Sequence, residues 1–382
     1  MAASARIGNY ARALKACGIN VKVVIAKRTE VYGRHPANTE ADGLFYDISY
    51  HYVSGTPLRS RGLFMRSLRD FLDVFATLRF LKRELTDGDA VIGYLDGHPF
   101  LVTCLLSWCR FARIKFVSEL CEYPYEADNR LSLKDKMERQ YVMNRLFPRF
   151  DGVIAISEYL ASFARTRCSP DCRMAKVPIL VDFEAFDVPD RSELEPVPYV
   201  FHCGTLYDKK DGYCDMLEAF GRALRDYGVK ARFVSTGSIA EAQNPVRVME
   251  IIKEYHMESQ VEFIGYVQGN DKRDWLSRAA LVIINKPDNL QNRSGFSTKL
   301  GEYLAAGKAI IHTRVGEAQN YLEDGKNARL VPCGDVAALA AAISSCLSDM
   351  SVSRRMGEEG KALCRSTFDF RCNGERILEA IL

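Results

Sequence analysis

Short apolar runs that alternate with helical stretches constrain the fold of this 382-residue chain more than any other feature. Long segments with helical periodicity, such as residues 63–85, separate most of these runs. Buried strands that alternate with helices form parallel sheets with helices on both faces. The sequence therefore predicts an α/β protein with doubly wound, Rossmann-like sheets. The predicted strands are residues 21–26, 90–94, 114–118 and 153–156 in the first half, and 199–203, 231–236, 261–264, 281–284, 309–312 and 328–331 in the second.

A proline-rich stretch separates the two series of strands. Residues 187–198 hold three prolines among charged side chains, which is typical of an interdomain linker. A chain of this length also suits two domains better than one core. Because ligands bind at the carboxyl ends of parallel strands, we expect the site in a cleft between two facing domains. The predicted parts are a first domain over 1–186, the linker, a second domain over 199–367 and a C-terminal helix over 368–382.

Composition excludes several classes of function. A net charge of +3 is small for a nucleic-acid-binding protein. The twelve cysteines form no C-x-x-C pair and no cluster with histidine, which argues against a zinc site and suits a reducing cytoplasm. No apolar run is long enough to span a bilayer. We therefore expect a cytoplasmic protein with no resident cofactor and no essential metal.

The stretch SGFSTKLGEYLAAGKAII, residues 294–311, combines groups that suit a nucleotide-sugar. Ser297 and Thr298 begin a predicted helix, and the free N–H groups and dipole of a helix start bind phosphate. Lys299 adds positive charge beside that start, and Glu302 is placed to hold a ribose hydroxyl. The spacing alone leaves a capped surface helix as an equal alternative.

The same stretch resembles the donor-site segment of retaining glycosyltransferases of the GT-B type, the group called family 4. Their pattern F-P-[ST]-K-[LIV]-x-E-Y-L-A-x-G-K-P-V is matched by Phe296, Thr298, Lys299, Leu300, Glu302, Tyr303, Leu304, Ala305, Gly307 and Lys308. Glu302 takes the place of the second of two glutamates, and Ser294 stands where the first would be. The resemblance covers nearly the whole chain and implies two Rossmann-like domains, with residues 368–382 returning to the first.

The resemblance also identifies donor-binding residues after other strands of the second half. Gly204 follows the strand at 199–203, Thr205 stands where the family has an arginine, and Lys210 takes the place of a lysine. Without the resemblance, a lysine in such a loop is usually only solvated. The predicted donor site comprises Gly8, Gly204, Thr205, Lys210, Gly237, Tyr266, Ser297, Thr298, Lys299, Leu300 and Glu302. Within it, Lys210 and Lys299 would stabilise the leaving diphosphate, and Tyr266 would stack on the base.

In the first half, residues 116–126 resemble the acceptor-side segment of the same family. Glu119 and Glu122 follow a strand there, and Glu122 is the predicted acid/base or acceptor-hydroxyl ligand. We accordingly predict Glu122, Lys210 and Glu302 as the catalytic residues. The alternatives are that both glutamates are loop carboxylates without chemistry, or that His98 is the polar group instead.

The beginning of the sequence resembles the glycine loop and first helix of the family. Gly8 takes the place of the loop glycine that approaches the donor. The family has a strand before this loop, and almost nothing precedes Gly8 here. We therefore expect the first strand to be missing and the chain to be truncated at its N-terminus.

Residues 57–85 combine seven basic side chains with many large apolar ones. Such a helix rests on an anionic leaflet, or it packs on the sheet of the first domain with its basic side in water. The basic residues are Arg59, Arg61, Arg66, Arg69, Arg79, Lys82 and Arg83. The first alternative places the protein at the inner face of the cell membrane.

The residues and the resemblance together predict a retaining hexosyltransferase. It would move a sugar from a nucleoside diphosphate sugar to a hydroxyl of a glycan or lipid-linked glycan in surface polysaccharide biosynthesis. The expected partners are that donor, that acceptor and an anionic membrane, with no nucleic acid. Two alternatives stay open: a sugar-nucleotide epimerase of the same architecture, and a non-catalytic sugar-nucleotide-binding protein, which Ser294 and Thr205 would favour.

Overall fold

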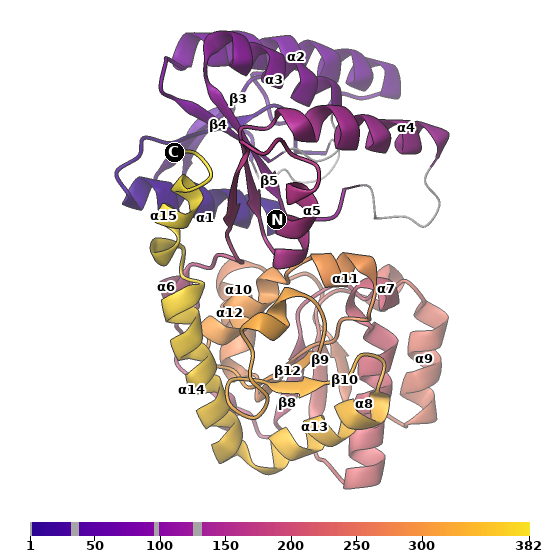
Figure 1. Cartoon of the computed structure of the whole chain (residues 1–382). Coiled ribbons are helices and arrows are strands. Elements are labelled where there is room, and N and C mark those ends of the chain that lie inside the picture. Colours follow the sequence, from indigo (N-terminus) through magenta and orange to yellow (C-terminus); the bar gives the residue numbers. More distant parts are fainter. Residues whose placement is uncertain (1, 32–37, 95–98, 125–131) are drawn as a thin grey trace. The chain divides into compact units, whose positions relative to one another are not determined.

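A computed structural model describes residues 2–31, 38–94, 99–124 and 132–382 of the chain. The chain forms two compact units, which are labelled by element in Figure 1. Unit 1 consists of Met1–Val177 and Phe370–Leu382, and unit 2 consists of Pro178–Asp369. The predicted first domain ended later, at residue 186, and the predicted linker at 187–198 lies within unit 2.

The earlier boundary follows from the packing of the segment just after Val177. The N–H of Val181 donates to the carbonyl of Phe368 at 2.9 Å, so this segment pairs with the end of unit 2. Helix α6 (Phe183–Phe186) packs against α12 (Thr298–Ala305), also in unit 2. Residues 178–186 therefore belong to the second unit although they precede the prolines.

Unit 2 contains one parallel sheet of six strands in the order β10-β9-β8-β11-β12-β13. This is the strand order of a Rossmann-like domain, in which the order of successive strands along the sheet reverses between β8 and β11. All six strands lie within one residue of their predicted bounds. They are β8 (Tyr199–His202), β9 (Arg232–Ser235), β10 (Val261–Phe263), β11 (Leu281–Ile284), β12 (Ile310–Thr313) and β13 (Arg329–Val331).

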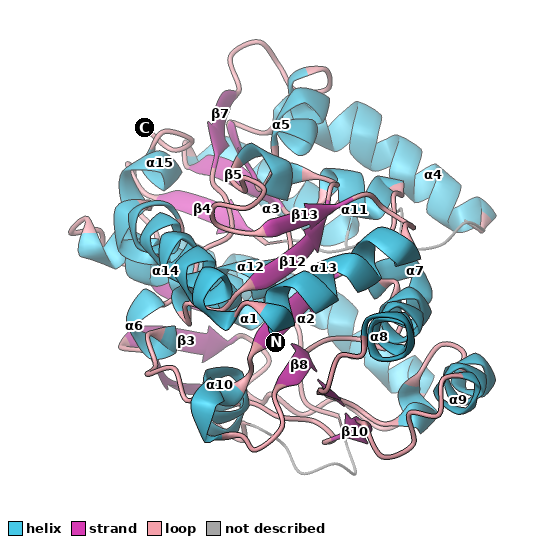
Figure 2. Cartoon of the chain, turned by 90° about the horizontal axis from the view of Figure 1, so that it is seen from below, coloured by secondary structure: helices cyan, strands magenta, loops and turns pink. Residues whose placement is uncertain are grey.

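Helices cover both faces of this sheet. On α8 (Tyr213–Tyr227), Tyr213, Met216 and Phe220 recur at helical spacing and are completely buried. They share a core with α9 (Pro245–Glu254) and α13 (Val336–Ser348). On the other side lie α12 and α14 (Met350–Thr367), and α10 (Gly269–Arg278) lies beside the central strand β8 (Figure 2). The sheet is thus buried on both faces, which explains its continuous apolar strands.

Unit 1 contains two smaller sheets. The first is parallel and has the order β4-β5-β6-β7, and the second has the order β1-β3-β2 with β2 antiparallel to β3. The sequence predicted β1, β4, β5 and β6 but missed β2, β3 and β7, whose polar and half-exposed residues give no apolar run. The strands are β1 (Lys22–Ile25), β2 (Asp42–Phe45), β3 (Ile48–Tyr52), β4 (Ala90–Gly93), β5 (Lys115–Leu120), β6 (Gly152–Ala155) and β7 (Arg173–Lys176).

The C-terminal residues complete the packing of unit 1. Helix α15 (Gly374–Leu378) lies against α1 (Ala2–Ala16), and Gly374 has no room for a Cβ beside the carbonyl of Ala13. The Lys115 ammonium donates to the carbonyl of Ile381 at 2.7 Å. The remaining helices of unit 1 include α2 (Leu63–Glu84), α3 (Pro99–Ala112), α4 (Leu133–Tyr141) and α5 (Glu158–Arg165).

No single helix in the described part of the chain has the length and apolar content of a membrane span. The helices α13 and α14 satisfy that test of length and composition only as a pair, which is bent by 101°.

Candidate functional site

Polar side chains gather in unit 2 where β8 and β11 end, at the point of strand reversal. The loop after β8 contains Gly204 and Thr205 and continues into the single turn α7 (Asp208–Asp211). The loop after β11 begins with Asn285 and Lys286. Because ligands of doubly wound sheets bind at this reversal point, the cluster marks the candidate site of unit 2.

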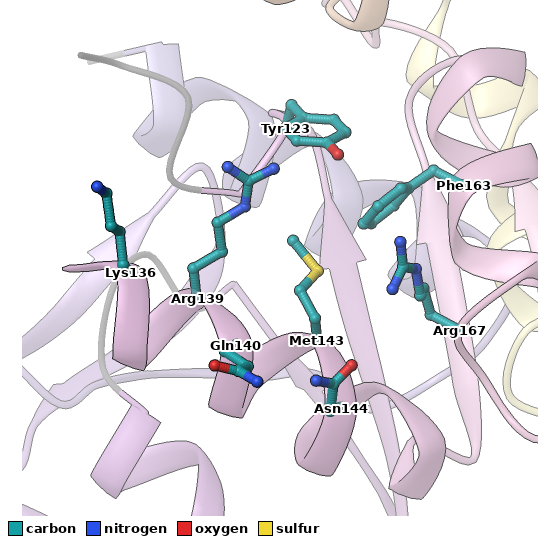
Figure 3. Close-up of a pocket in the computed structure, with 8 residues that line it drawn as sticks. All are labelled: Tyr123, Lys136, Arg139, Gln140, Met143, Asn144, Phe163 and Arg167. Atoms are coloured by element: carbon teal, nitrogen blue, oxygen red, sulfur yellow. The ribbon is translucent and has the colours of Figure 1, made fainter. Parts of the chain in front are cut away.

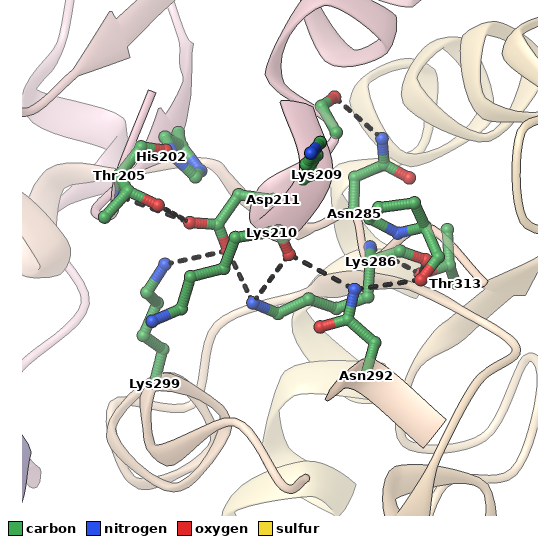
Figure 4. Close-up of polar contacts among 12 residues, drawn as sticks. His202, Thr205, Lys209, Lys210, Asp211, Asn285, Lys286, Asn292, Lys299 and Thr313 are labelled. Atoms are coloured by element: carbon green, nitrogen blue, oxygen red, sulfur yellow. Dashed lines mark hydrogen bonds and ion pairs between the residues drawn. The ribbon is translucent and has the colours of Figure 1, made fainter. Parts of the chain in front are cut away.

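Asp211 is the centre of this cluster, which is shown in Figure 4. Its carboxylate is 2% exposed and accepts hydrogen bonds from both the N–H and the hydroxyl of Thr205. The ammonium of Lys286 lies 2.5 Å from Oδ1 of Asp211, and that of Lys299 lies 3.4 Å from the same oxygen. The side chain of Lys210 runs beside Lys299 (Figure 4). Two lysine ammonium groups therefore pair with one carboxylate, a third lysine lies beside them, and the local charge is positive.

Burial and mutual attraction shift the pKa values of these groups. Burial alone would raise the pKa of Asp211, but Lys299 and Lys286 outweigh it and hold this pKa well below its usual range. The pKa of Lys286 falls to about 8, because burial of its ammonium outweighs the attraction of Asp211. Asp211 is therefore ionised at neutral pH, and Lys286 is a weakened cation that an additional anion would stabilise.

Gly204 allows these groups to approach the backbone closely. A Cβ at this position would collide with the Lys299 ammonium and with the ring of His202. His202 is buried, and its Nε2 lies 3.2 Å from the carbonyl of Thr205. Burial, with Lys299 nearby, lowers the pKa of His202 to about 4, so its ring is neutral at pH 7. Glycine is thus required at position 204, where the chain leaves β8 close to Lys299.

The helix start predicted at residues 297–300 is present, with Ser297 at the N-cap of α12. The Ser297 side chain makes no capping hydrogen bond, and Thr298 is half-buried in the first turn. Leu300 differs from its predicted role because its side chain is fully buried and its N–H already donates to the carbonyl of Ser297. Lys299 is therefore the residue of this turn whose side chain reaches the Asp211 cluster.

Glu302 lies one turn further along α12 and is already ion-paired. Its partner is Lys272 of α10, and both side chains are largely buried. Burial lowers the pKa of Lys272, but the Glu302 carboxylate outweighs that effect and the pKa is raised overall. Ser294, in α11 (Leu290–Ser294), is fully buried at the position of the missing first carboxylate. Glu302 thus carries the one carboxylate of the two-glutamate pattern.

Gly237 and Tyr266 follow β9 and β10. Gly237 and Gly265 exchange backbone hydrogen bonds of 2.7 and 3.2 Å, and both adopt positive φ angles of 90° and 71°. Only glycine adopts such angles without strain. Tyr266 directly follows this bridge and is 62% exposed.

The predicted residues of unit 1 have different surroundings from those expected. Glu119 is buried and forms an ion pair of 2.5 Å with Arg6 of α1, so it belongs to the core of unit 1. Glu122 is exposed in the loop after β5. Gly8 lies inside α1, not in a loop, and a Cβ there would touch the ring of Phe45. His98 lies outside the described residues.

Sequence reasoning missed Asp211, Lys286 and Lys272. Lys286 directly follows a correctly predicted strand end, which was an available signal for a site residue. Asp211 sits beside the predicted Lys210, but its partners lie 75 and 88 positions away in the sequence, so spacing could not identify it. The structure brings Thr205, Lys210 and Lys299 to one cluster and leaves Glu122 and Gly8 in the other unit.

Comparisons with known proteins agree with this geometry. Residues 197–349, from β8 to α13, match the family model of the glycosyl transferases group 1. Unit 2 is thus similar to the glycosyl transferases group 1 over most of its length. The N-acetyl-alpha-D-glucosaminyl L-malate synthase of Bacillus anthracis is 24% identical to this chain over 147 residues, which are 38% of the chain. The aligned part spans 35% of that relative's length.

Solved structures extend the likeness beyond the group 1 domain to both units. Sucrose-phosphate synthase from Thermosynechococcus elongatus has a TM-score of 0.72 at 16% identity, covering 97% of this chain and 90% of that one. The HepE protein of Anabaena in complex with UDP has a TM-score of 0.65 at 17% identity, covering 85% of each chain. The predicted GT-B fold class, with two Rossmann-like domains, is confirmed by these likenesses.

Proposed function

We propose that the chain is a retaining glycosyltransferase that moves a hexose or related sugar from a nucleoside diphosphate sugar to a hydroxyl of a glycan or lipid-linked glycan. The observation that carries the proposal is the cluster of Lys210, Lys286 and Lys299 around Asp211 at the strand reversal of a group 1 domain. A diphosphate needs compensating positive charge as it leaves, and fixed cations supply it without reorganisation.

The reaction breaks the bond between the anomeric carbon and the diphosphate oxygen, which keeps the electron pair. The acceptor hydroxyl oxygen forms the new bond to that carbon and loses its proton, for which Glu122 is the proposed acceptor. Lys299 and Lys286 stabilise the charge that develops on the diphosphate. Glu302 holds the ribose hydroxyls, while the ion pair with Lys272 orients its carboxylate.

A role at the inner face of the cell membrane, in surface polysaccharide synthesis, is supported by α2. Phe64 is 79% exposed, and with the other apolar residues of the first three turns it forms a stripe on one side of the helix. The same side continues into exposed basic residues in the last turns. Apolar insertion beside cations fits an anionic bilayer surface. The stripe is Phe64, Met65, Leu68, Phe71, Leu72 and Phe75, and the basic residues are Arg79, Lys82 and Arg83.

The donor is tested by thermal shift of the full chain against UDP-, GDP- and ADP-sugars. A ligand that binds only the folded state raises the melting temperature. We expect one nucleotide to do so, and the shift to be lost in Lys299→Gln and Glu302→Ala. Lys230→Gln, a change of an exposed cation elsewhere in unit 2, is the matched control and should keep the shift. The absence of a shift with all three donors would overturn the proposal.

A second function, sugar-nucleotide binding without turnover, is favoured by the buried Ser294. No carboxylate occupies this position, and the site is too enclosed to accept one without repacking. A donor hydrolysis assay with added acceptors separates the two functions. Release of nucleoside diphosphate with transfer of the sugar supports the transferase, whereas a thermal shift without any release supports the binding protein.

A further inference from the structure

Unit 1 contains a pocket of about 330 Å³ between α4 and α5. Among the described residues, its lining combines three cationic side chains, two aromatic rings, two amides and a methionine, without a carboxylate. Figure 3 shows these side chains pointing toward a common space. They are Tyr123, Lys136, Arg139, Gln140, Met143, Asn144, Phe163 and Arg167.

One wall of the pocket is a continuous helical surface, along which the helix changes from α to π geometry. Lys136, Gln140 and Asn144 are spaced four residues apart, so they lie along one side of the helix. The α-helix α4 passes into the π-helix η1 (Val142–Leu146) within this surface. Isolated π-helical turns are rare and occur frequently at functional sites. The turn contributes Met143, which is 7% exposed and forms the apolar floor.

The two arginines are held by aromatic rings. The Cζ of Arg139 lies 5.6 Å from the ring centroid of Tyr123, and the Cζ of Arg167 lies 5.6 Å from that of Phe163. The two rings are themselves 4.9 Å apart. A guanidinium held over an aromatic ring keeps its N–H groups available to an anion.

These cations have no anionic partner within the described parts of the chain. Arg139, Arg167 and Lys136 form no ion pair with a described residue. Like charges brought together without a counter-ion repel one another, and a bound anion relieves that repulsion. Two fixed guanidinium forks match the oxygen pairs of a phosphate, and the nearby amides can donate to a third oxygen.

We propose that this pocket binds a phosphate group of the acceptor substrate. Three cations match the charge of a phosphate monoester or diphosphate, which is about −1.5 to −2 for a monoester at neutral pH. The aromatic rings and Met143 would cover the apolar part next to that phosphate. The donor's phosphates are assigned to the lysines of unit 2, so a second anion site serves another ligand. The identity of that ligand as the acceptor rests on the proposed function, whereas anion binding at the pocket does not.

The pocket is tested by titration calorimetry of the full chain with phenyl phosphate, at low salt and without phosphate buffer. The donor site is first saturated with the nucleotide found by thermal shift, or, if none is found, blocked by Lys299→Gln. We expect Arg139→Gln/Arg167→Gln to weaken binding about 10- to 100-fold, as for lost charge-assisted hydrogen bonds. Arg139→Lys/Arg167→Lys keeps the charge but loses the fork, and should bind with intermediate affinity.

Arg145→Gln is the matched control, because Arg145 is an exposed cation on η1 outside the pocket. Equal binding by the wild type and the double variant would overturn the proposal, as would an equal loss in Arg145→Gln. Flotation with vesicles containing phosphatidic acid distinguishes a lipid phosphate from a soluble phosphate as the ligand of the pocket. A difference between wild type and double variant on vesicles alone assigns the phosphate to a lipid, and a difference with phenyl phosphate shows that a soluble phosphate suffices. A failure here leaves the donor thermal shift unchanged, so the two proposals fail separately.

Discussion

The Asp211 carboxylate organises the candidate donor site because two lysines of this cluster, Lys286 and Lys299, pair with it. Removing one partner of a buried ion pair leaves the remaining charges uncompensated, which costs far more than the net value of the pair. Its ion pairs with Lys286 and Lys299 also orient those ammonium groups. Asp211 therefore supports both the stability of unit 2 and the charge presented to a ligand.

We predict that Asp211→Asn lowers the free energy of unfolding of unit 2 by about 3 kcal/mol, the lower end of the range for broken buried pairs. Asp215→Asn is the matched control, because burial raises the pKa of that neighbouring half-buried carboxyl and no cation pairs with it among the described residues. Urea unfolding at pH 7 measures both variants. Equal stability of Asp211→Asn and the wild type would contradict this account.

Two buried histidines make the stability of unit 2 depend on pH. The pKa values of His202 and His312 both fall to about 4, mainly through burial. The unfolded chain binds their protons at about pH 6.5, so it binds more protons than the fold between these values. The contribution of these two histidines to the free energy of unfolding therefore rises as pH increases from about 4 to 6.5. Above about pH 6.5 this contribution is constant.

We predict that His202→Gln lowers the slope of the unfolding free energy against pH, between about pH 4 and 6.5, by the contribution of about one proton. The glutamine Nε2 can still donate to the carbonyl of Thr205, so the fold is retained. Unfolding free energy measured by urea at several pH values between 4 and 7 gives the slope for each protein. His256→Gln is the control, because His256 is an exposed histidine in a turn of the same unit. An unchanged slope in His202→Gln would show that the ring is already charged in the folded state.

The limits of sequence reasoning at this scale follow from distance along the chain. Lys299 and Glu302 belong to one continuous motif, so their role could be predicted from a single segment. Lys286 and Asp211 meet because β8 and β11 are adjacent in the sheet, which spacing does not reveal. Gly8 was misplaced because a glycine in a helix interior and one in a loop look alike without the preceding strand.

At the scale of elements, α2 has two unlike sides. Val74 and Leu81 are buried, while Phe64, Phe71 and Phe75 on the opposite side are about half exposed or more. Phe71 stacks on Phe100 of α3, with ring centroids 5.6 Å apart. A contiguous exposed apolar surface of this kind marks an interaction site in a soluble protein. The basic last turns of α2 favour an anionic membrane as the partner that we propose for this surface.

We predict that the chain floats with vesicles containing anionic lipid at low salt, and that Phe64→Asp/Phe71→Asp reduces the bound fraction at least fivefold. Each aspartate removes apolar area that would insert into the membrane, and it adds repulsion from the anionic lipid surface. Leu194→Asp, an exposed apolar residue of unit 2, is the control for a general change of solubility. Binding that is equal in the wild type and the double variant, or absent from the wild type, would refute a membrane role for α2.

The elements of the two units differed in how well they could be predicted. Unit 2 has strands buried on both faces, so each strand is a continuous apolar run between polar turns. Unit 1 adds β2, β3 and β7, which carry residues such as Asp42, Gly43 and Arg173 and are partly exposed. Their pairing depends on neighbouring strands, and only the folded arrangement supplies those neighbours.

At the scale of the whole molecule, each unit has its own core and its own sheets. The last thirteen residues of the chain, Phe370–Leu382, belong to unit 1, although unit 2 lies between them and the rest of unit 1 in the sequence. Ile377 and Ala380 are buried against unit 1, and the guanidinium of Arg12 lies 4.0 Å from the ring centroid of Phe370. Removal of this segment exposes apolar surface in unit 1 and leaves the core of unit 2 intact.

We predict that calorimetry of the full chain shows two unfolding transitions, and that truncation after Asp369 lowers one of them by about 5 °C or more, since a loss of 1 kcal/mol shifts a domain of 150–250 residues by about 2–4 °C. The other transition should keep its temperature and still rise when the nucleotide that binds unit 2 is added. Ile377→Asp repeats the test without shortening the chain, and deletion of the exposed Leu382 alone is the control. If the truncated chain lost both transitions together, the two units would unfold as one cooperative structure and the donor site would depend on the C-terminal segment. If both transitions kept their temperatures, the packing of α15 on α1 would contribute nothing to the stability of unit 1.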